Sequence, residues 1–211
     1  MQQREFIDFL MAENVLKFGD FTLKSGRQSP YFFNLGEVAS GAAFARLGEA
    51  YAESIVQSGL EFDVLFGPAY KGIPIAVATA SALAAKGRNV GVAYNRKEAK
   101  THGEGGALVG APVKGRVLLI DDVLTSGKAI REALALIDGT QAEIAGAVIA
   151  MDRQEKNDQG ATAVTALAEE ISAPVISIAN LAKLIEYLEA DNRFAEILAR
   201  MQNYRQQYCV A

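Results

Sequence analysis

The sequence is poor in cysteine and histidine, and each shortage excludes a class of protein. Cys209 is the single cysteine of 211 residues, so the fold is not a disulfide scaffold, and we expect a reducing, cytoplasmic location. His102 is the single histidine. One histidine gives no argument for a metal site built by the protein, and we predict none.

Basic charge and long apolar runs are also scarce. The 21 basic and 25 acidic residues give a formal net charge of −4, which argues against a broad nucleic-acid surface. The longest uncharged stretch, Gly72–Ala85, is shorter than the about 20 residues that cross a bilayer. Arg4, Glu5 and Asp8 interrupt the apolar residues of the N-terminus, so we expect no secretory signal. We therefore expect neither a nucleic acid nor a membrane as partner.

Apolar residues, in contrast, are abundant. Half of the residues are hydrophobic and 22% are charged, which is typical of a globular protein with a sizeable core. At about 150 residues per domain, the length predicts one domain over residues 1–211 with a small appendage.

Helical spacing of apolar residues predicts four helices. The sets that share one face are Phe44, Leu47, Tyr51 and Ile55; Ile130, Ala133, Leu134 and Ile137; Leu181, Leu184, Ile185 and Leu188; and Phe194, Ile197, Leu198 and Met201. Gly59, Gly87 and Gly139 follow helical stretches, where glycine can adopt the left-handed conformation that ends a helix.

Short apolar runs predict the strands of a parallel sheet. The runs are continuous rather than alternating, which is typical of strands covered on both faces, and they recur about every 27 to 30 residues, the length of a βαβ unit. They lie at residues 64–66, 90–94, 117–120, 144–151 and 175–178. We predict an α/β fold with an open, parallel, five-stranded sheet and helices on both faces.

Two segments depart from this pattern. Between Tyr94 and Val117 there is no apolar stripe but several glycines, which predicts a flexible lid over about residues 96–114. Residues 1–35 hold a helix and then short strand-like pieces. We expect them to form an appendage on the core, residues 36–211.

The strongest chemical signal is the stretch Val-Leu-Leu-Ile-Asp-Asp-Val-Leu-Thr-Ser-Gly-Lys-Ala at residues 117–129. Asp121 and Asp122 end a strand, where open α/β sheets bind their ligands. The turn that follows opens a helix, whose free N–H groups and positive dipole end favour a phosphate. Thr125 and Ser126 add hydroxyl donors, and carboxylates can accept hydrogen bonds from sugar hydroxyls. The stretch therefore predicts a site for a ribose 5-phosphate.

Other interpretations of this stretch are weaker. A P-loop needs glycine five residues before the Gly-Lys pair, and Asp122 stands there. The strand is similar to a Walker B strand, but the chain has no Walker A partner. The structural alternative is that Asp122 only caps a helix.

The stretch resembles the phosphoribosyl pyrophosphate (PRPP) motif of the type I phosphoribosyltransferases. The resemblance implies five parallel core strands, a mobile loop and a variable hood, here residues 1–35. Lys128 departs from the small hydroxyl residue of many relatives, although a cation there is compatible with a phosphate. The residues that the resemblance assigns to PRPP are Asp121, Asp122, Val123, Leu124, Thr125, Ser126, Gly127, Lys128 and Ala129.

Three segments, residues 21–33, 66–74 and 94–106, narrow the resemblance to the orotate phosphoribosyltransferases. The first is Phe-Thr-Leu-Lys-Ser-Gly-Arg, followed by Pro-Tyr-Phe-Phe at residues 30–33. The resemblance implies that Lys24 lies at the phosphate end of PRPP and that Phe32 and Phe33 lie at the orotate pocket. An aromatic pair beside a cation suits a flat anionic base. Packing in a hydrophobic core is the alternative on sequence alone.

Residues 66–74 follow a strand and open a helix, which makes a second anion cradle. The segment resembles the family's pyrophosphate loop, with Tyr70 and Lys71 as contacts. A solvated lysine is the alternative. Because a cation is unfavourable at the positive end of a helix dipole, the position of Lys71 favours a bound anion.

The predicted lid is basic in a chain that is acidic overall. It resembles the family's flexible catalytic loop, which implies that Arg96, Lys97, Lys100 and His102 meet the pyrophosphate, some of them across a dimer interface. A solvated charged surface is the alternative.

Arg153 follows the run at residues 144–151 and is expected at the same edge of the sheet. The resemblance assigns it, with Thr125, to orotate, and an arginine pairs well with a planar carboxylate. A structural salt bridge is the alternative.

The resemblance implies an enzyme that joins orotate to PRPP, releasing pyrophosphate and orotidine 5′-monophosphate. It makes Lys71, Lys100 and His102 the groups that stabilise the leaving pyrophosphate, and Asp121 and Asp122 those that hold the ribose. Mg²⁺ would be held mainly by PRPP oxygens. The family implies a homodimer with shared active sites.

Three other functions are compatible with parts of the sequence. A transferase for a purine or uracil base is disfavoured by Phe32, Phe33 and Arg153, which suit orotate. A PRPP-sensing regulator would need a nucleic-acid surface, and a receiver-like signalling domain would leave the basic lid and the loop at residues 67–72 unexplained.

Overall fold

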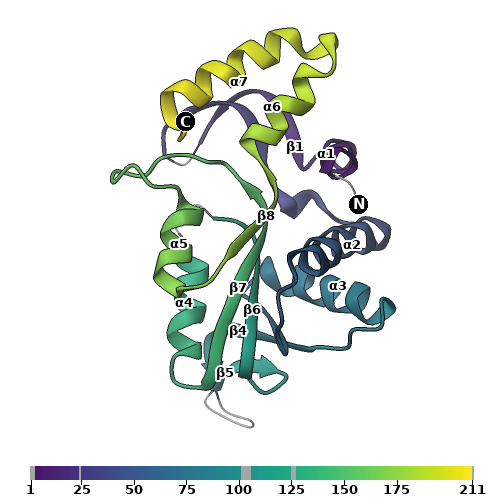
Figure 1. Cartoon of the computed structure of the whole chain (residues 1–211), viewed down its shortest axis with the longest axis vertical. Helices are drawn as coiled ribbons and strands as arrows, with labels where there is room; N and C mark the ends of the chain where they lie inside the picture. Colours follow the sequence, from purple (N-terminus) through teal and green to yellow (C-terminus); the bar gives the residue numbers. More distant parts are fainter. Residues whose placement is uncertain (1–2, 24, 101–105, 125–126, 211) are drawn as a thin grey trace.

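The computed structural model describes residues 3–23, 25–100, 106–124 and 127–210, with the backbone alone at 98–100. A mostly parallel sheet has helices on both faces and further elements at one end (Figure 1). The strand order is β5-β4-β3-β6-β7-β8. The strands are β3 (Val64–Gly67), β4 (Gly91–Lys100), β5 (Gly106–Gly110), β6 (Lys114–Val123), β7 (Gln141–Asp152) and β8 (Val175–Asn180).

The five parallel strands predicted from the apolar runs are confirmed. β3 pairs in parallel with β4 and β6, β7 pairs with β6, and β8 pairs with β7. Both faces of these strands are buried, because alternate residues enter two separate cores. Leu118 and Ile120 of β6 lie in the larger core, whereas Val117 and Leu119 lie in the smaller one.

The sixth strand was not predicted, and it replaces part of the expected lid. β5 pairs antiparallel with β4, so much of residues 96–114 forms a hairpin rather than a loop. The apolar run in β5 is only Ala107, Leu108 and Val109, too short to stand out among glycines. Gly110, at φ +99°, permits the close approach, since a Cβ there would lie 2.2 Å from the Val92 carbonyl oxygen.

Helices cover the two faces as expected. α2 (Gly41–Ser58) and α3 (Gly72–Ala85) lie on one side of the sheet, and α4 (Lys128–Ile137) and α5 (Ala163–Ile171) lie on the other (Figure 1). Gly59 and Gly87 take the predicted positive φ after their helices, at +69° and +85°. Gly139, which lies two residues after the end of α4 at Ile137, does not.

The appendage predicted for residues 1–35 consists of α1 (Gln3–Ala12), β1 (Leu16–Thr22) and β2 (Gln28–Phe33), followed by the short η1 (Leu35–Glu37). Two C-terminal helices, α6 (Leu181–Glu189) and α7 (Ala195–Tyr208), pack with it, joined by η2 (Asn192–Phe194). From here on, the hood means this whole set of N- and C-terminal elements, which is larger than the hood of residues 1–35 expected from the sequence. It lies beyond the carboxyl ends of the strands, where β8 runs directly into α6 (Figure 1).

The strand order places a topological switch point between β3 and β6. From β3 the chain crosses through α3 to β4 on one side, whereas β6 continues to β7 and β8 on the other. Loops that leave adjacent strands in opposite directions open a crevice at their carboxyl ends, where ligands of open α/β sheets bind. Among the described residues, no helix is long and apolar enough to cross a membrane.

Candidate active site

Lys71 joins the loops at the switch point. It ends the β3–α3 loop, and its Nζ lies 2.8 Å from Oδ2 of Asp122, near the carboxyl end of β6. The same Nζ donates to Asn34 Oδ1 of the hood at 3.1 Å. The predicted pyrophosphate loop and the predicted ribose carboxylates are therefore brought together.

Asp121 and Asp122 lie next to each other but in different environments. Asp121 is 8% exposed, and its Oδ1 accepts a hydrogen bond from the Asp122 backbone N–H. Burial, and then the neighbouring Asp122 carboxylate, raise the pKa of Asp121 to about 7. Asp122 reaches the crevice, where it accepts from Lys71. One carboxyl is thus shielded while the other faces a cation.

Two helix N-termini open at this edge without a capping side chain. Gly127, at φ +65°, precedes α4, and the N-cap of α3, Lys71, makes no side-chain cap bond. In contrast, α2, α5 and α6 are capped by Ser40, Thr162 and Asn180. At α4 the free N–H groups and the positive dipole end can bind an anion, as the sequence predicts. At α3 the Gly72 and Ile73 N–H groups already donate to the Pro68 and Tyr70 carbonyl oxygens, so the dipole end and Lys71 remain for an anion.

The β3–α3 loop is held close to the sheet by glycine. A Cβ at Gly72 would lie 2.7 Å from the Ile120 carbonyl oxygen, and one at Gly67 would lie 2.3 Å from the Gly72 oxygen. Asn95 of β4 secures the other side of the loop, since its Oδ1 accepts from the Ala69 N–H at 2.9 Å. The loop that carries Tyr70 and Lys71 is therefore fixed from two neighbouring strands.

The aromatic pair at the end of β2 divides into an exposed and a buried member. Phe32 is 37% exposed, and its ring stacks on Phe21 with 5.4 Å between centroids. Phe33 is 9% exposed and belongs to the larger core. Phe32 therefore offers a ring face to a ligand, while Phe33 has the core packing that the sequence left open.

Arg153 lies where β7 ends, as predicted, and it is held by internal partners. Its Nε lies 2.5 Å from Glu155 Oε1, and its Nη2 donates to Ser29 Oγ and Tyr204 OH, each at 3.2 Å. Its guanidinium carbon lies 4.3 Å from the centroid of the Tyr31 ring. Burial lowers the pKa of Arg153, but Tyr31, Glu155 and Tyr204 outweigh it and raise the pKa. The salt bridge that the sequence offered as an alternative is present.

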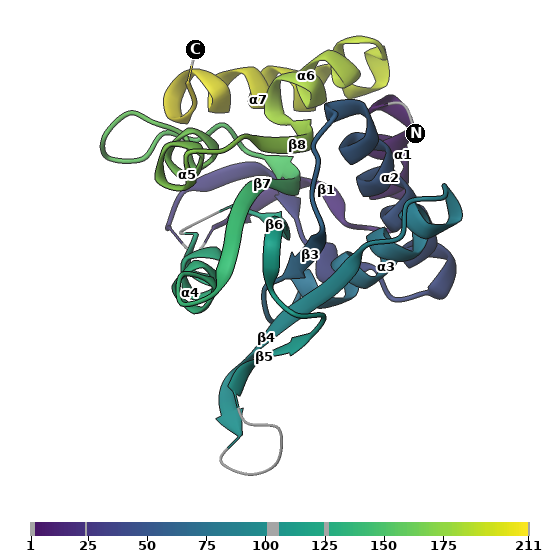
Figure 2. The same ribbon diagram turned by 60° about the horizontal axis from the view of Figure 1, so that its bottom comes forward.

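Arg96, Lys97 and the backbone of Lys100 lie on β4, whose hairpin with β5 projects from the body of the molecule (Figure 2). Lys97 reaches back toward the pyrophosphate loop, with its Nζ 4.9 Å from the centroid of the exposed Tyr70 ring. Arg96 is partly buried beside it.

The remaining predicted residues divide between described and undescribed positions. Val123 ends β6, Leu124 is buried, and Ala129 lies in the first turn of α4. Lys128 points to solvent and pairs with Glu132 at 3.7 Å. Lys24, His102, Thr125 and Ser126 lie outside the described residues, as does the side chain of Lys100.

The sequence analysis did not identify several residues that contact and hold the predicted site residues. Asn34 and Asn95 each follow the aromatic residue that ends an apolar run, a position that could have indicated them. Tyr51 of α2 donates to the Asp121 carbonyl oxygen at 2.7 Å, and no local pattern separates it from the apolar helix face. Glu155 and Tyr204 contact Arg153 from a loop and from α7.

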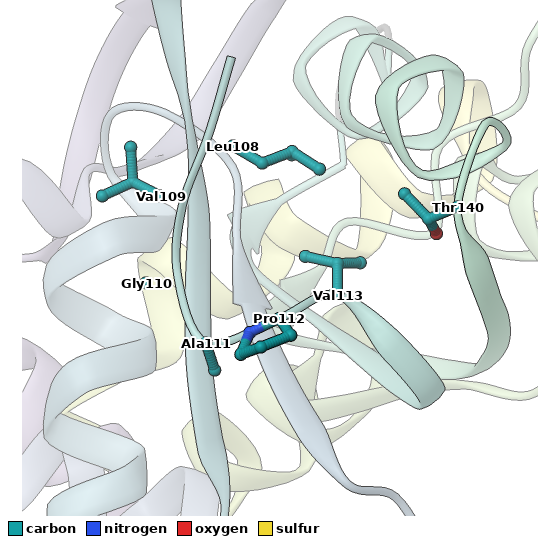
Figure 3. Close-up of a pocket in the computed structure, with 7 residues that line it drawn as sticks. All are labelled: Leu108, Val109, Gly110, Ala111, Pro112, Val113 and Thr140. Atoms are coloured by element: carbon teal, nitrogen blue, oxygen red, sulfur yellow. The ribbon is translucent and has the colours of Figure 1, made fainter. Parts of the chain in front are cut away.

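A pocket of about 230 Å³ lies away from Lys71 and Asp122 (Figure 3). It is lined by residues 108–113 and Thr140, which lie around the starts of β6 and β7. This is the amino edge of the parallel strands, opposite to Asp121 and Asp122. The Thr140 hydroxyl is already bonded to the Ile137 carbonyl oxygen. We therefore assign this pocket no part in the site.

Comparison with known proteins agrees with this geometry. Residues 34–179 match the phosphoribosyl transferase domain family. The chain is 54% identical over 207 residues to an orotate phosphoribosyltransferase of Klebsiella pneumoniae, covering 98% of this chain and 97% of that protein. A relative of the same description in Pseudomonas paraeruginosa is 53% identical, with the same coverage.

A crystal structure of orotate phosphoribosyltransferase from Francisella tularensis superposes with a TM-score of 0.87. The two sequences are 40% identical, and the match covers 98% of this chain and 100% of that one. The chain therefore belongs to the phosphoribosyltransferases, and among them to the orotate phosphoribosyltransferase family.

Proposed function

We propose that this protein is an enzyme that transfers the 5-phosphoribosyl group from PRPP to orotate. The products are orotidine 5′-monophosphate and pyrophosphate, and the reaction is a step of pyrimidine biosynthesis. The observation that carries the proposal is the contact of Lys71 with Asp122, which brings the start of α3 to the strand end that leads into α4. It sets a cation and a carboxylate between the two helix N-termini, as a sugar with phosphates at both ends requires.

The ribose 5-phosphate would lie on the β6–α4 loop. The N–H groups that open α4 after Gly127 suit the phosphate, together with the hydroxyls of Thr125 and Ser126. Asp122 faces the crevice and would accept hydrogen bonds from the ribose hydroxyls, with Asp121 behind it. Positive charge that develops on the sugar ring would be stabilised by these carboxylates.

The pyrophosphate would lie on the β3–α3 loop. Lys71 would exchange its bonds to Asp122 and Asn34 for the pyrophosphate oxygens, and Tyr70 would lie beside them. Arg96, Lys97, Lys100 and His102 would add positive charge from the hairpin as the leaving group becomes more negative. A hairpin closed over the crevice would also exclude water and protect PRPP from hydrolysis.

The base would lie under the hood. Phe32 offers an exposed ring face, with Phe33 supporting it from the core. Arg153 would bind the orotate carboxylate, with Thr125 nearby and Lys24 at the phosphate end of PRPP. No covalent nucleophile is needed, because positioning and charge stabilisation suffice for displacement at the anomeric carbon.

Magnesium fits the chemistry of this edge. Carboxylate oxygens are the hard donors that Mg²⁺ prefers, and Asp121 and Asp122 supply them. The described residues hold no group of three or more His, Cys, Asp or Glu side chains that could bind a metal ion. We propose that PRPP oxygens hold the metal, with these carboxylates assisting. The metal would neutralise charge on the leaving pyrophosphate.

We propose a cytoplasmic homodimer in which hairpins serve neighbouring sites. The support is the projection of the hairpin from its own chain, with basic residues along it (Figure 2).

A competition experiment tests the proposed function. Pyrophosphate release from PRPP would be measured with orotate, uracil or adenine as the acceptor. We expect release with orotate at a kcat/KM at least about a hundredfold above that with either other base, because only orotate offers a carboxylate to Arg153. Preference for uracil or adenine would contradict the assignment of the base. PRPP binding without turnover of any base would favour a regulator.

A further inference from the structure

Arg153, which we propose to bind the orotate carboxylate, is held by hydrogen bonds to other side chains. Three of its contacts come from different parts of the chain: Ser29 in β2, Glu155 after β7 and Tyr204 in α7. The side chain of Arg153 is only 11% exposed. A buried guanidinium held on several sides has one orientation, so its partners decide which edge a ligand meets.

The contacts leave one edge of the guanidinium available. Nε is taken by Glu155, and Nη2 is shared between Ser29 and Tyr204. No described residue accepts a hydrogen bond from Nη1. Because a guanidinium is planar and rigid, fixing Nε and Nη2 also fixes the direction of the Nη1 donors.

The charges of Arg153, Arg27 and Glu155 do not cancel. Glu155 serves two cations, since Oε1 pairs with Arg153 and Oε2 lies 3.1 Å from Arg27 Nη1. Among the described side chains, no other carboxylate forms an ion pair with either arginine. The three groups therefore keep one net positive charge, which an anionic ligand can balance.

Tyr204 links the partners of Arg153 to each other. Its hydroxyl donates to Glu155 Oε1 at 2.6 Å and accepts from Arg153 Nη2. Burial, and then the bond to Glu155, raise the pKa of Tyr204 to about 12, so this hydroxyl stays a donor at neutral pH. The ring is 3% exposed and packs edge-on against Tyr31.

The C-terminal segment also holds the backbone beside Arg153. The Val210 N–H donates to the Gln154 carbonyl oxygen at 3.0 Å, and the Lys156 N–H donates to that of Tyr208 at 2.8 Å. Gln154, at φ +55°, bonds through its side chain to the Ala182 N–H at the start of α6. Both C-terminal helices thus stabilise the turn that carries Arg153 and Glu155.

We propose that Glu155 and Tyr204 are positioning residues for the acceptor base, which aim the Nη1 edge of Arg153 at the orotate carboxylate. This inference rests on the proposed function. It assigns α7, which carries no recognisable motif, a role in choosing a base with a carboxylate.

The test compares Tyr204→Phe with Tyr208→Phe. Tyr208 lies one turn further along α7 and contacts Arg27 through its ring, which phenylalanine keeps. We expect Tyr204→Phe to raise the KM for orotate about tenfold, because a hydrogen bond to a charged group is lost. The KM for PRPP and the inhibition constant of uracil, which lacks the carboxylate, should change less than about twofold. Tyr208→Phe should resemble the wild type.

A double-mutant cycle separates positioning from a general structural effect. In an Arg153→Lys background, Tyr204→Phe should have little further effect on the KM for orotate, because the group that it orients is gone. Ser29→Ala, which removes another Nη2 partner with a smaller change, should shift the KM for orotate in the same direction. This variant keeps the test decisive if Tyr204→Phe does not fold.

Two failures are distinguishable. An active wild type whose KM for orotate is unchanged in Tyr204→Phe and Ser29→Ala would overturn the inference alone, as would equal losses for orotate, uracil and PRPP. A wild type that does not convert orotate with PRPP would contradict the proposed function and the inference together.

Discussion

Lys71 is the side chain on which the two halves of the site depend. Its Nζ contacts Asp122 near the carboxyl end of β6 and Asn34 of the hood, and it stands at the positive end of α3. A cation at that end of a helix is unfavourable unless an anion compensates it. Asp122 compensates it in the free protein, and the pyrophosphate would do so in the complex.

Replacing Lys71 should therefore affect turnover far more than folding. We expect Lys71→Ala to lower kcat by about a hundred- to a thousandfold, the usual cost of losing one charge-stabilising group. Steady-state kinetics with PRPP and orotate would measure it. Lys86→Ala is a matched control at the other end of α3, where Lys86 lies 3.8 Å from Glu53. Equal kcat values for the two variants would reject the role of Lys71.

Asp121 makes stability depend on pH. Its pKa is about 7 in the fold, above its ordinary value of 3.8, so the folded state binds more protons than the unfolded state between these values. Its contribution to stability is thus full at low pH and is lost as the pH rises to about 7. Asp121→Asn removes this loss and keeps an oxygen for the Asp122 N–H.

Thermal or denaturant unfolding would measure the effect. We expect the free energy of unfolding of Asp121→Asn, relative to that of the wild type, to increase by about 1–3 kcal/mol as the pH rises from 5 to 8. A stability difference that does not vary with pH would show that Asp121 titrates normally in the fold.

The sequence allowed the placement of Lys71, Asp121, Asp122 and Arg153 at one edge of the sheet to be predicted, because each stands at the end of a predicted parallel strand or in the loop that follows it. Carboxyl ends of parallel strands share one edge, so order along the chain was enough. The contacts of Arg153 with Tyr204 and Ser29 could not be predicted. They join residues 51 and 124 positions apart, and no periodicity carries that information.

At the scale of elements, the β3–α3 loop depends on close approach of backbone to backbone. A Cβ at Gly72 would lie 2.7 Å from the Ile120 oxygen and 2.8 Å from Pro68 Cδ. Neither neighbour can move without shifting β6 or the loop itself. The anion cradle and the sheet are thus coupled through this glycine.

We expect Gly72→Ala to lower the free energy of unfolding by about 1–3 kcal/mol and to weaken PRPP binding. Chemical denaturation and calorimetry with PRPP would measure the two effects. Gly41→Ala is the control, because a Cβ there meets nothing within 4 Å at the start of α2. Wild-type PRPP affinity in Gly72→Ala would mean that the cradle does not depend on the close approach.

The β4–β5 hairpin shows where element prediction fails. Glycines and charges in residues 96–114 indicate a loop by composition, yet the backbone pairs Tyr94 with Val109 and Asn95 with Leu108. Edge pairing of this kind is set by the partner strand rather than by local propensity. Arg96 and Lys97 lie on this segment, but its regular structure was not predicted.

At the scale of the whole molecule, the proposal that hairpins serve neighbouring sites predicts complementation. Lys100→Ala and Asp122→Asn should each be nearly inactive alone. After the two variants are mixed equally and allowed to exchange subunits, half of the dimers are mixed, and each holds one intact site. We expect about a quarter of the wild-type activity. Activity no higher than the sum of the separate variants would show that each site is built from one chain.

The hood is built from elements at both ends of the chain. The N-terminal elements were predicted as an appendage, but the C-terminal helices that pack with them carried no usable motif. Arg27 of the N-terminal part reaches Glu155, and Tyr204 of the C-terminal part reaches the same carboxylate. The surroundings of Arg153 therefore depend on both ends of the chain, which is why sequence motifs alone could not delimit them.

The central claim is that this crevice joins orotate to PRPP. Its most direct test follows the absorbance of orotate after addition of PRPP and Mg²⁺, with and without a chelator. We predict loss of orotate that requires PRPP and stops when the metal is removed. Unchanged absorbance, with folded protein, PRPP and Mg²⁺ all present in the assay, would contradict the account.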